Sequence, residues 1–181
     1  MRANNSAGPS SDFSGPDFYA TPGWATRALS ENEIFEGEIW ECACGDGAMS
    51  KVLEETGHPV RSSDLNDRGY GEVSVDFLSA RTGADNIVTA PPRSSAEHFL
   101  QHGLTLARRK LALLLPASFW YGEKRLERIH AITPPNRVWL FARGLYLYPP
   151  SDKVRNHGRV FCGWFIWERG AAVENKARML F

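Results

Sequence analysis

Two glycines in a short turn are the first residues whose spacing points to chemistry, namely the binding of a small ligand. Gly45 and Gly47 follow the apolar pair Ile39–Trp40 and precede apolar residues at helical spacing, which predicts a strand, a turn and a helix. Glycines accept positive φ and let backbone N–H groups approach a bound molecule, while the helix directs its positive end at the same place. Glu41, at the end of the strand, would lie beside that ligand. A Gly-x-Gly turn also occurs merely to reverse a chain, so this pattern alone leaves both interpretations open.

Further acidic residues have the spacing of a nucleoside site. Pro59–Asp64 predicts a second strand that ends in an acid, 17 residues after the second glycine. In doubly wound folds an acid about 20 residues beyond the glycines binds the hydroxyl groups of a ribose. The alternative for Asp64 is an aspartate in a solvated turn. Val73–Leu78 predicts a third strand whose end carries Asp76 and Phe77, which would offer edge and face contacts to a purine.

A pair of prolines closes the fourth predicted strand, Asn86–Arg93. Pro91 and Pro92 donate no backbone hydrogen bond and hold the chain extended, so we expect a stiff finger at the carboxyl edge of the sheet. Ser94–Glu97 then matches a capping box that opens a helix. Two histidines four residues apart lie on the outer face of that helix, and we interpret them as solvent-facing rather than as a zinc pair.

The remaining pattern predicts an α/β domain built on a mostly parallel, Rossmann-like sheet of seven strands. Lys110–Pro116 is a continuous apolar run, as expected for a strand buried on both faces of a parallel sheet. Arg159–Trp167 and Ala177–Phe181 predict an antiparallel pair at the C-terminal edge. Near the N-terminus, Thr21 is placed to cap a helix whose first turn contains Pro22. A short helix at Gly122–Ile132 and a strand at Arg137–Phe141 complete the expected elements.

The composition fits a single domain of 181 residues whose charges balance, with 21 Lys and Arg against 21 Asp and Glu. No global field therefore favours a polyanion or a membrane, and any nucleic acid must meet a local patch. The loop Pro149–Arg159 is such a patch. We expect Lys153, Arg155 and Arg159 to contact phosphates, with Arg93 across the cleft, and the alternative is an ordinary solvated loop.

The ends of the chain and its cysteines indicate the compartment. Residues 1–16 are rich in Ser, Asn, Gly and Pro, so we expect a mobile leader before a domain that spans residues 17–181. Three cysteines, two of them at Cys42 and Cys44, suggest reduced thiols in an intracellular protein, and neither they nor the scattered histidines have the spacing of a metal site. No apolar signal core begins the chain and no stretch has the length to cross a bilayer, so we expect a cytoplasmic protein.

Taken in order, these residues resemble the class I methyltransferases that use S-adenosyl-L-methionine, in particular the small DNA adenine N6-methyltransferases of phages and prophages. The resemblance covers roughly residues 17–170 of the chain, and its motifs are specific in their order rather than singly. The motifs are Asp17-Phe18-Tyr19-x-Thr21-Pro22-x-Trp24, Trp40-Glu41-x-Ala43-Cys44-Gly45-x-Gly47, Asp64, Asp76-Phe77, Pro91-Pro92 and Trp164-Phe165-Ile166-Trp167-Glu168.

The resemblance implies a Rossmann-like fold, S-adenosylmethionine as cofactor, and DNA, or else RNA, as substrate. It also implies a role for each motif near the cofactor. Glu41, Cys42, Ala43, Gly45 and Gly47 would hold the methionine part, Asp64 the ribose, and Asp76 with Phe77 the adenine, while Tyr19, Thr21 and Pro22 would close the pocket.

The chain departs from this family where the methyl group would be transferred. The family usually has Asn-Pro-Pro followed by Tyr or Phe, whereas this chain has Ala90-Pro91-Pro92-Arg93. In the family, the Asn side chain and the next Pro carbonyl accept hydrogen bonds from the target amino group, and the aromatic ring stacks on a flipped base. Ala90 removes the first acceptor, and Arg93 replaces the ring by a guanidinium that can itself stack on a base. Deleting one such preorganised group costs on the order of 10² to 10³ in rate.

Three functions are therefore compared. The first is a nucleic-acid methyltransferase that is slow, inactive or altered in target. The second is a cofactor-binding relative without adenine methylation, which acts as a binding module or on a different substrate. The third, a nicotinamide oxidoreductase, fits least, because Ser50 stands where the third glycine of the dinucleotide fingerprint belongs. The sequence leaves the target base, its context and the oligomeric state open.

Overall fold

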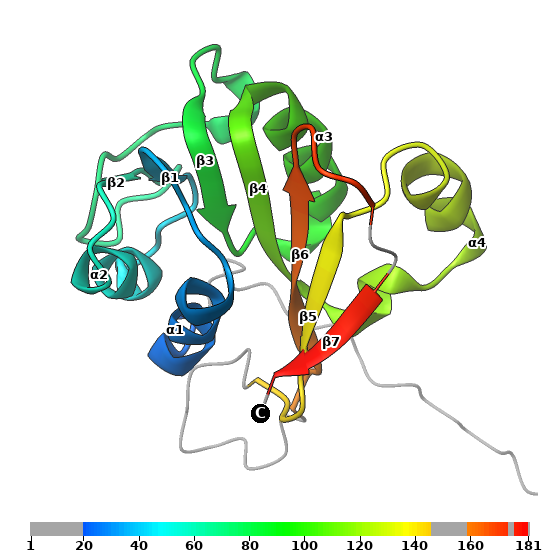
Figure 1. Cartoon of the computed structure of the whole chain (residues 1–181). Helices are drawn as coiled ribbons and strands as arrows, with labels where there is room; N and C mark the ends of the chain where they lie inside the picture. The colour runs from blue at the N-terminus through cyan, green and yellow to red at the C-terminus, as the bar shows by residue number, and fades with distance from the viewer. Residues whose placement is uncertain (1–19, 146–158, 174–175, 181) are drawn as a thin grey trace, which may run out of the picture.

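The computed structural model describes residues 20–145, 159–173 and 176–180. These residues form a seven-stranded sheet with helices on both of its faces (Figure 1). The predicted leader and most of the Pro149–Arg159 loop lie outside the described residues. The strands are β1 (Ile39–Glu41), β2 (Val60–Ser62), β3 (Ala84–Thr89), β4 (Ala107–Pro116), β5 (Arg137–Phe141), β6 (Cys162–Glu168) and β7 (Lys176–Leu180). The helices are α1 (Gly23–Asn32), α2 (Ala48–Glu55), α3 (Ala96–Leu106) and α4 (Glu123–Arg125), which continues into a π-helical turn at Leu126–His130.

The order of the strands across the sheet is β2-β1-β3-β4-β6-β5-β7. β2, β1, β3 and β4 run parallel, β6 runs antiparallel between β4 and β5, and β7 runs parallel to β5. The predicted α/β class, with a mostly parallel seven-stranded sheet and antiparallel pairing toward its C-terminal edge, is confirmed. The partners differ from the prediction, because β5 lies between β6 and β7. Val138 and Trp139 of β5 are buried on opposite faces of the sheet, and the two edges of this strand pair with β6 and β7.

The predicted third strand, Val73–Leu78, is wrong. Glu72, just before the segment, forms an isolated bridge with Ser63, and the segment itself donates the Val75 N–H to the Asp64 carbonyl before a 3₁₀ turn at Phe77–Ser79. Two features bend the chain away from an extended path. Ser74 has φ 60°, and the Asp76 side chain accepts the Leu78 N–H at 3.0 Å. The strand predicted at Ala177–Phe181 is present as β7 and completes the seven strands.

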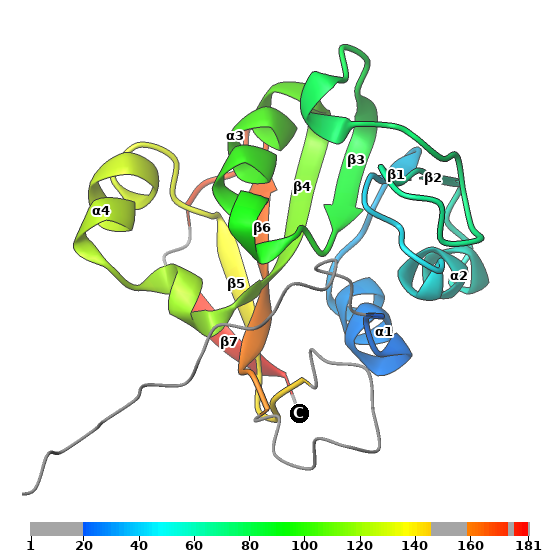
Figure 2. The ribbon, with the colours of Figure 1, turned by 180° about the vertical axis from the view of Figure 1, so that it is seen from behind.

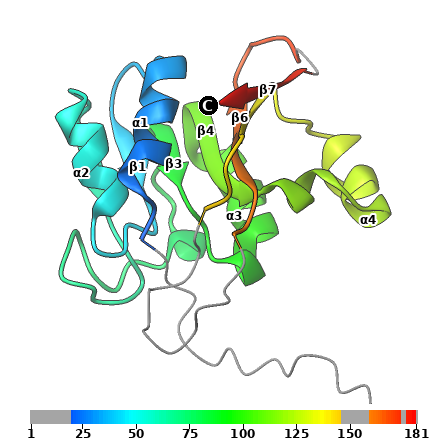
Figure 3. The same cartoon turned by 90° about the horizontal axis from the view of Figure 1, so that it is seen from below.

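Alternating side chains of the central strands build two hydrophobic layers, one on each face of the sheet. On one face Leu111, Leu113 and Leu115 of β4 pack with α3, and on the other face Ala112 and Leu114 pack beneath α1 and α2. Seen from below, α1 and α2 lie on one side of the sheet and α3 on the other (Figure 3). The prediction that the apolar run of β4 is buried on both faces is confirmed.

The predicted helix caps are wrong by one or two residues. The residue before the first turn of α1 is Pro22, whose carbonyl accepts the Ala25 N–H, and no side chain caps this helix. A 3₁₀ turn at Arg93–Ser95 precedes α3, which begins at Ala96 without a side-chain cap. The proposed capping box fails because the carboxylate of Glu97 binds Arg125 at 3.0 Å instead of a backbone N–H.

Two sequence-wide features are visible in the described part of the chain. None of its helices combines the length and the apolar character that crossing a bilayer requires. All three cysteines are buried and unpaired thiols.

Candidate functional site

The turn between β1 and α2 has the conformation that its glycines were expected to allow. Gly45 and Gly47 both have positive φ, 56° and 78°. A side chain at Gly47 would collide with the ring of Tyr70, because a Cβ atom there would lie 2.4 Å from ring carbons. The lack of a side chain at Gly47 therefore allows the Tyr70 ring to pack over it. Gly47 does not line the cavity described below. Gly45 does line it.

Asp64 joins the end of β2 to the glycine turn. One carboxylate oxygen accepts the Gly45 N–H at 2.9 Å and the other accepts the Asn66 N–H at 2.8 Å. The side chain is buried, yet it lies on the cavity wall. This position, at the carboxyl end of the second parallel strand, is the one from which an acid reaches a ribose. The solvated-turn alternative does not describe a carboxylate that is only 7% exposed.

Glu41 is a buried carboxyl group at the end of β1. Its Oε2 accepts a hydrogen bond from the hydroxyl of Ser50, which also contacts the hydroxyl of Ser62 at 2.7 Å. Burial raises the pKa of Glu41 to about 8, and the negative charges of Asp64 and Asp46 add to the effect, while the bonds from Ser50 oppose it. This carboxyl group is thus largely protonated at neutral pH.

Asp76 and Phe77 follow in the turn that replaces the predicted third strand. Asp76 caps the turn through Leu78 N–H and the hydroxyl of Ser79. The Phe77 ring is buried and packs edge-on against Trp40, with its centre 4.7 Å from that of Phe99. The ring thus forms part of an apolar wall.

The two prolines extend from the end of β3 at the carboxyl edge of the sheet, as predicted. Pro91 is buried, Ala90 and Pro92 are half-buried, and Arg93 is exposed. The Pro92 carbonyl accepts the Ser95 N–H at 3.0 Å, whereas no described residue donates a backbone hydrogen bond to the Pro91 carbonyl.

These parts surround one cavity of about 340 Å³ at the carboxyl ends of β1, β2, β3 and β4. The structure brings together most of the residues that the sequence predicted, namely Thr21, Pro22, Glu41, Cys42, Ala43, Gly45, Asp64, Asp76, Phe77, Ala90, Pro91, Pro92 and Arg93. Tyr19, Lys153 and Arg155 lie outside the described residues. Arg159 is exposed and does not line the cavity.

Sequence reasoning missed several residues of the wall. The loop after β2 contributes Asn66 and Arg68, and the start of α3 contributes Ser95 and Phe99. In the sequence these segments show only a turn or a helical apolar pattern, neither of which indicates a ligand. Cys162 reaches the cavity because β6 pairs with β4, and Leu145 reaches it through a bridge to Val160 just before β6. Neither pairing leaves a local sequence pattern. Burial raises the pKa of the Cys162 thiol to about 12, although the charge of Arg93 opposes this shift.

The two ends of the cavity differ in chemistry. Four carboxyl groups, those of Glu41, Asp46, Asp64 and Asp76, line the end formed by β1 and β2. The other end, formed by β3, β4 and β6, is mainly apolar. Within the described residues, no group of three or more His, Cys, Asp or Glu side chains is arranged to hold a metal ion.

Comparison with solved structures identifies the fold. A candidate RNA methyltransferase from Pyrococcus horikoshii superposes with a TM-score of 0.63 at 15% identity, covering 86% of this chain and 90% of the other. The candidate modification subunit of a type I restriction enzyme from Vibrio vulnificus gives 0.60 at 11%, covering 90% of this chain and 46% of the other. A dimethyladenosine transferase from Plasmodium falciparum gives 0.53 at 12%, covering 82% and 61%.

At these identities the likeness defines the fold alone. The chain has the Rossmann-like fold of S-adenosylmethionine-dependent methyltransferases, and it spans less than half the length of the Vibrio chain. No model of a known protein family and no curated protein matches the sequence.

Proposed function

We propose that this protein is an S-adenosylmethionine-dependent methyltransferase that acts on nucleic acid, and that its target is the N6 amino group of adenine in DNA. The observation that carries the proposal is the single cavity in which the glycine turn, Asp64 and the proline finger meet at the carboxyl edge of a methyltransferase-like sheet. The similar structures from Pyrococcus, Vibrio and Plasmodium, whose names refer to RNA, restriction modification and adenosine, support a nucleic-acid substrate.

The lining of the cavity fits this cofactor. S-adenosylmethionine carries a positive sulfonium and a positive ammonium group, and four carboxyl groups line the end of the cavity where Gly45 lies. A nicotinamide dinucleotide would bring a negative pyrophosphate to the same place, where the carboxylates of Asp46, Asp64 and Asp76 would repel it, whereas the protonated Glu41 would not. Val75, Phe77, Leu78 and Phe99 provide an apolar wall for an adenine ring. The charge of the site thus favours the methyl donor over the dinucleotide.

In this proposal the bound cofactor supplies an electrophilic methyl group, and the chain binds and orients the two reactants. Asp64 accepts hydrogen bonds from the ribose through lone pairs that Gly45 and Asn66 do not use. The carbonyl of Pro91 accepts a hydrogen bond from the target amino group and so directs its lone pair toward the methyl group. Ala90 offers no second acceptor, which predicts slow transfer.

The altered finger also favours a second candidate, a relative that binds the cofactor but does not methylate adenine. The observation behind it is that Ala90 leaves the finger without a side-chain amide and that the exposed guanidinium of Arg93 stands where the family has a stacking ring. Such a protein would bind S-adenosylmethionine and act on another substrate or as a binding module.

Tritiated methyl transfer from S-adenosylmethionine to adenine-containing DNA tests the first candidate, and the control is DNA in which each adenine is replaced by purine, which lacks only the N6 amino group. We expect slow incorporation that depends on that amino group. Cofactor binding with no incorporation into either DNA would favour the second candidate.

A further inference from the structure

A second cavity, of about 310 Å³, lies beside the first on the α3 side of the sheet. It is enclosed by the end of β4, the first turn of α3 and the 3₁₀ turn Ala117–Trp120, a region visible in Figure 2. Pro91, Arg93 and Pro116 line both cavities and therefore form the wall between them. A group bound in the second cavity would lie next to a substrate held against the proline finger.

Arg125 presents a fixed guanidinium to this second cavity. Its Nε donates to Glu97 at 3.0 Å, its Nη1 donates to the carbonyl of Ser118 at 3.1 Å, and its Cζ lies 4.9 Å from the centre of the Phe119 ring. Its Nη2 donates to none of the described residues. The guanidinium is thus held through Nε and Nη1, and the N–H groups of Nη2 are left for a ligand, so binding there would order few additional rotatable bonds of the side chain.

Arg93 supplies a second guanidinium from the shared wall. It is exposed and forms no hydrogen bond or ion pair with a described residue. The other polar side chains around this cavity are Ser94, Ser118, Glu97 and His98. With histidine neutral, the two arginines and one glutamate leave one positive charge in excess. Two guanidinium groups around a cavity are suited to the oxygen atoms of a phosphate.

We propose that the second cavity binds a phosphodiester group of the substrate strand, next to the nucleotide that enters the first cavity. The inference rests on the proposed function, because it takes nucleic acid as the substrate. Arg125 is the anchor on the far side of the cavity and Arg93 the contact on the shared wall. A backbone phosphate held here would fix the position of the neighbouring base relative to Pro91 without any contact to the base itself.

Two matched pairs of variants test this site by fluorescence anisotropy with a labelled single-stranded oligodeoxynucleotide, without cofactor and without turnover. Arg125→Gln removes the proposed contact, and Arg128→Gln removes an exposed arginine nearby that lines neither cavity. We expect Arg125→Gln to reduce the slope of log affinity against log salt by about 0.7, the value for one phosphate on a single strand, and Arg128→Gln to leave it unchanged.

The second pair tests the site by a gain of affinity, which a folding defect in Arg125→Gln could not imitate. Glu97→Gln removes the negative charge beside the proposed phosphate, and Glu127→Gln removes an exposed charge on the same helical segment as Arg128. We expect Glu97→Gln to tighten binding about threefold or more and Glu127→Gln to have no effect.

The outcomes separate the two proposals. If the parent binds DNA in a salt-dependent way but the members of each pair behave alike, the phosphate site is wrong and the proposed function stands. If the parent shows no salt-dependent affinity for DNA, nucleic acid is removed as the substrate and both proposals fail.

Discussion

At the scale of single residues, substitutions at Ala90 distinguish the two candidate functions, a slow adenine methyltransferase and a relative that uses the same fold for another purpose. Ala90→Asn restores the missing acceptor on the proline finger, and Ala90→Leu adds a side chain of similar size without an acceptor. We predict that Ala90→Asn raises methyl transfer to adenine by on the order of 10², because one preorganised hydrogen-bonding group contributes that much.

The affinity for S-adenosylmethionine should stay nearly unchanged in Ala90→Asn, since the gain lies in the chemical step. Single-turnover incorporation of tritiated methyl groups, with calorimetry of the cofactor alongside, measures both quantities. Equal rates for Ala90→Asn and Ala90→Leu would mean that the cavity does not receive a flipped adenine.

Glu41 gives the stability of the unliganded protein a defined pH dependence. Its pKa is raised to about 8 by burial, while in the unfolded chain it has the ordinary glutamate pKa of 4.5. Between these values the folded state holds a proton that the unfolded state has lost, so this residue makes the protein less stable as pH rises from 4.5 toward 8. Below 4.5 both states are protonated and the effect disappears.

Glu41→Gln replaces the carboxyl group by a neutral group of the same shape. We predict that the unfolding free energy of Glu41→Gln minus that of the parent increases by up to about 1.4 kcal/mol per pH unit between pH 5 and 8. Urea denaturation of the two proteins across this range provides the comparison. A difference that does not change with pH would contradict the assignment of a buried, protonated Glu41.

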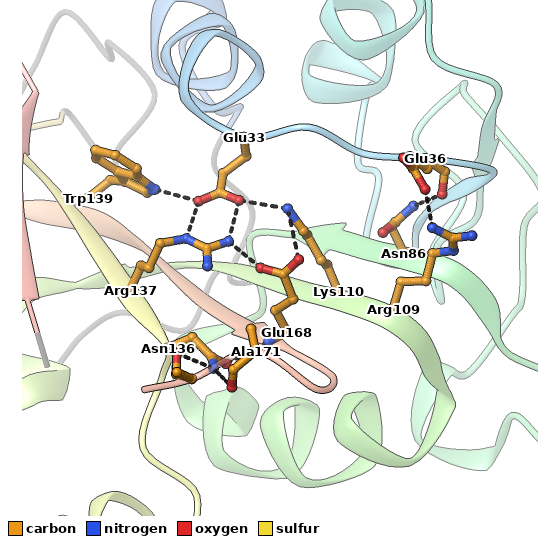
Figure 4. Close-up of polar contacts among 11 residues, drawn as sticks. Glu33, Glu36, Asn86, Arg109, Lys110, Asn136, Arg137, Trp139, Glu168 and Ala171 are labelled. Atoms are coloured by element: carbon orange, nitrogen blue, oxygen red, sulfur yellow. Dashed lines mark hydrogen bonds and ion pairs between the residues drawn. The ribbon is translucent and has the colours of Figure 1, made fainter. Parts of the chain in front are cut away.

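At the scale of elements, a buried ion network ties α1 to three strands (Figure 4). Glu33, at the end of α1, accepts two hydrogen bonds of 2.7 Å from Arg137 and one of 2.8 Å from Trp139, and it pairs with Lys110 at 3.0 Å. Glu168 of β6 binds the same two cations. The first residues before α1, Thr21 and Pro22, line the cavity, so this network holds one wall of the site in place from the opposite end of the helix.

The matched variants Glu33→Gln and Glu36→Gln measure how much this network contributes to the free energy of unfolding. Glu33 is buried, and although burial itself would raise its pKa, hydrogen bonds from Arg137, Trp139 and Lys110 hold the pKa below its ordinary value. Glu36 pairs with Arg109 at an exposed site, also drawn in Figure 4. We predict that Glu33→Gln lowers the unfolding free energy by about 3 kcal/mol and Glu36→Gln by less than about 1 kcal/mol.

The pH sign of Glu33 is opposite to that of Glu41. Because its folded pKa is lowered, its stabilising contribution is present above 4.5 and is lost as pH falls through the folded pKa. The stability difference between parent and Glu33→Gln should therefore shrink below pH 4.5. Denaturation curves at pH 7 and pH 3.5 test this. Equal losses in the Glu33 and Glu36 variants at pH 7 would show that the network contributes no more than a surface pair.

The elements could be predicted from the sequence where hydrophobic pattern decides them. The run in β4 and the strand-turn-helix around Gly45 were predictable, because burial on both faces and a glycine turn leave local signatures. Val73–Leu78 could not be, since its alternating apolar residues suit a strand while the positive φ of Ser74 and the capping by Asp76 act against one. The capping box at Ser94 failed for a similar reason, because the long-range pair between Glu97 and Arg125 outweighed the local bond.

At the scale of the whole molecule, parallel strands explain why the site could be predicted in part. Carboxyl ends of parallel strands meet at one edge, so the motifs after β1, β2 and β3 had to lie close together once the strands were recognised. The antiparallel strand β6 brings Cys162 to the same edge from the other end of the chain, and the position of β5 between β6 and β7 depends on tertiary pairing. Neither leaves a local pattern.

The central claim is that the cavity binds S-adenosylmethionine, and titration calorimetry tests it most directly. We predict a dissociation constant in the micromolar range, about −7 to −8 kcal/mol, and weaker binding of NAD. Asp64→Ala should weaken cofactor binding tenfold or more. Asp67→Ala, which removes an exposed acid that accepts the Gly69 N–H in the same loop, should not. No heat of binding with S-adenosylmethionine, or tighter binding of NAD, would contradict the claim.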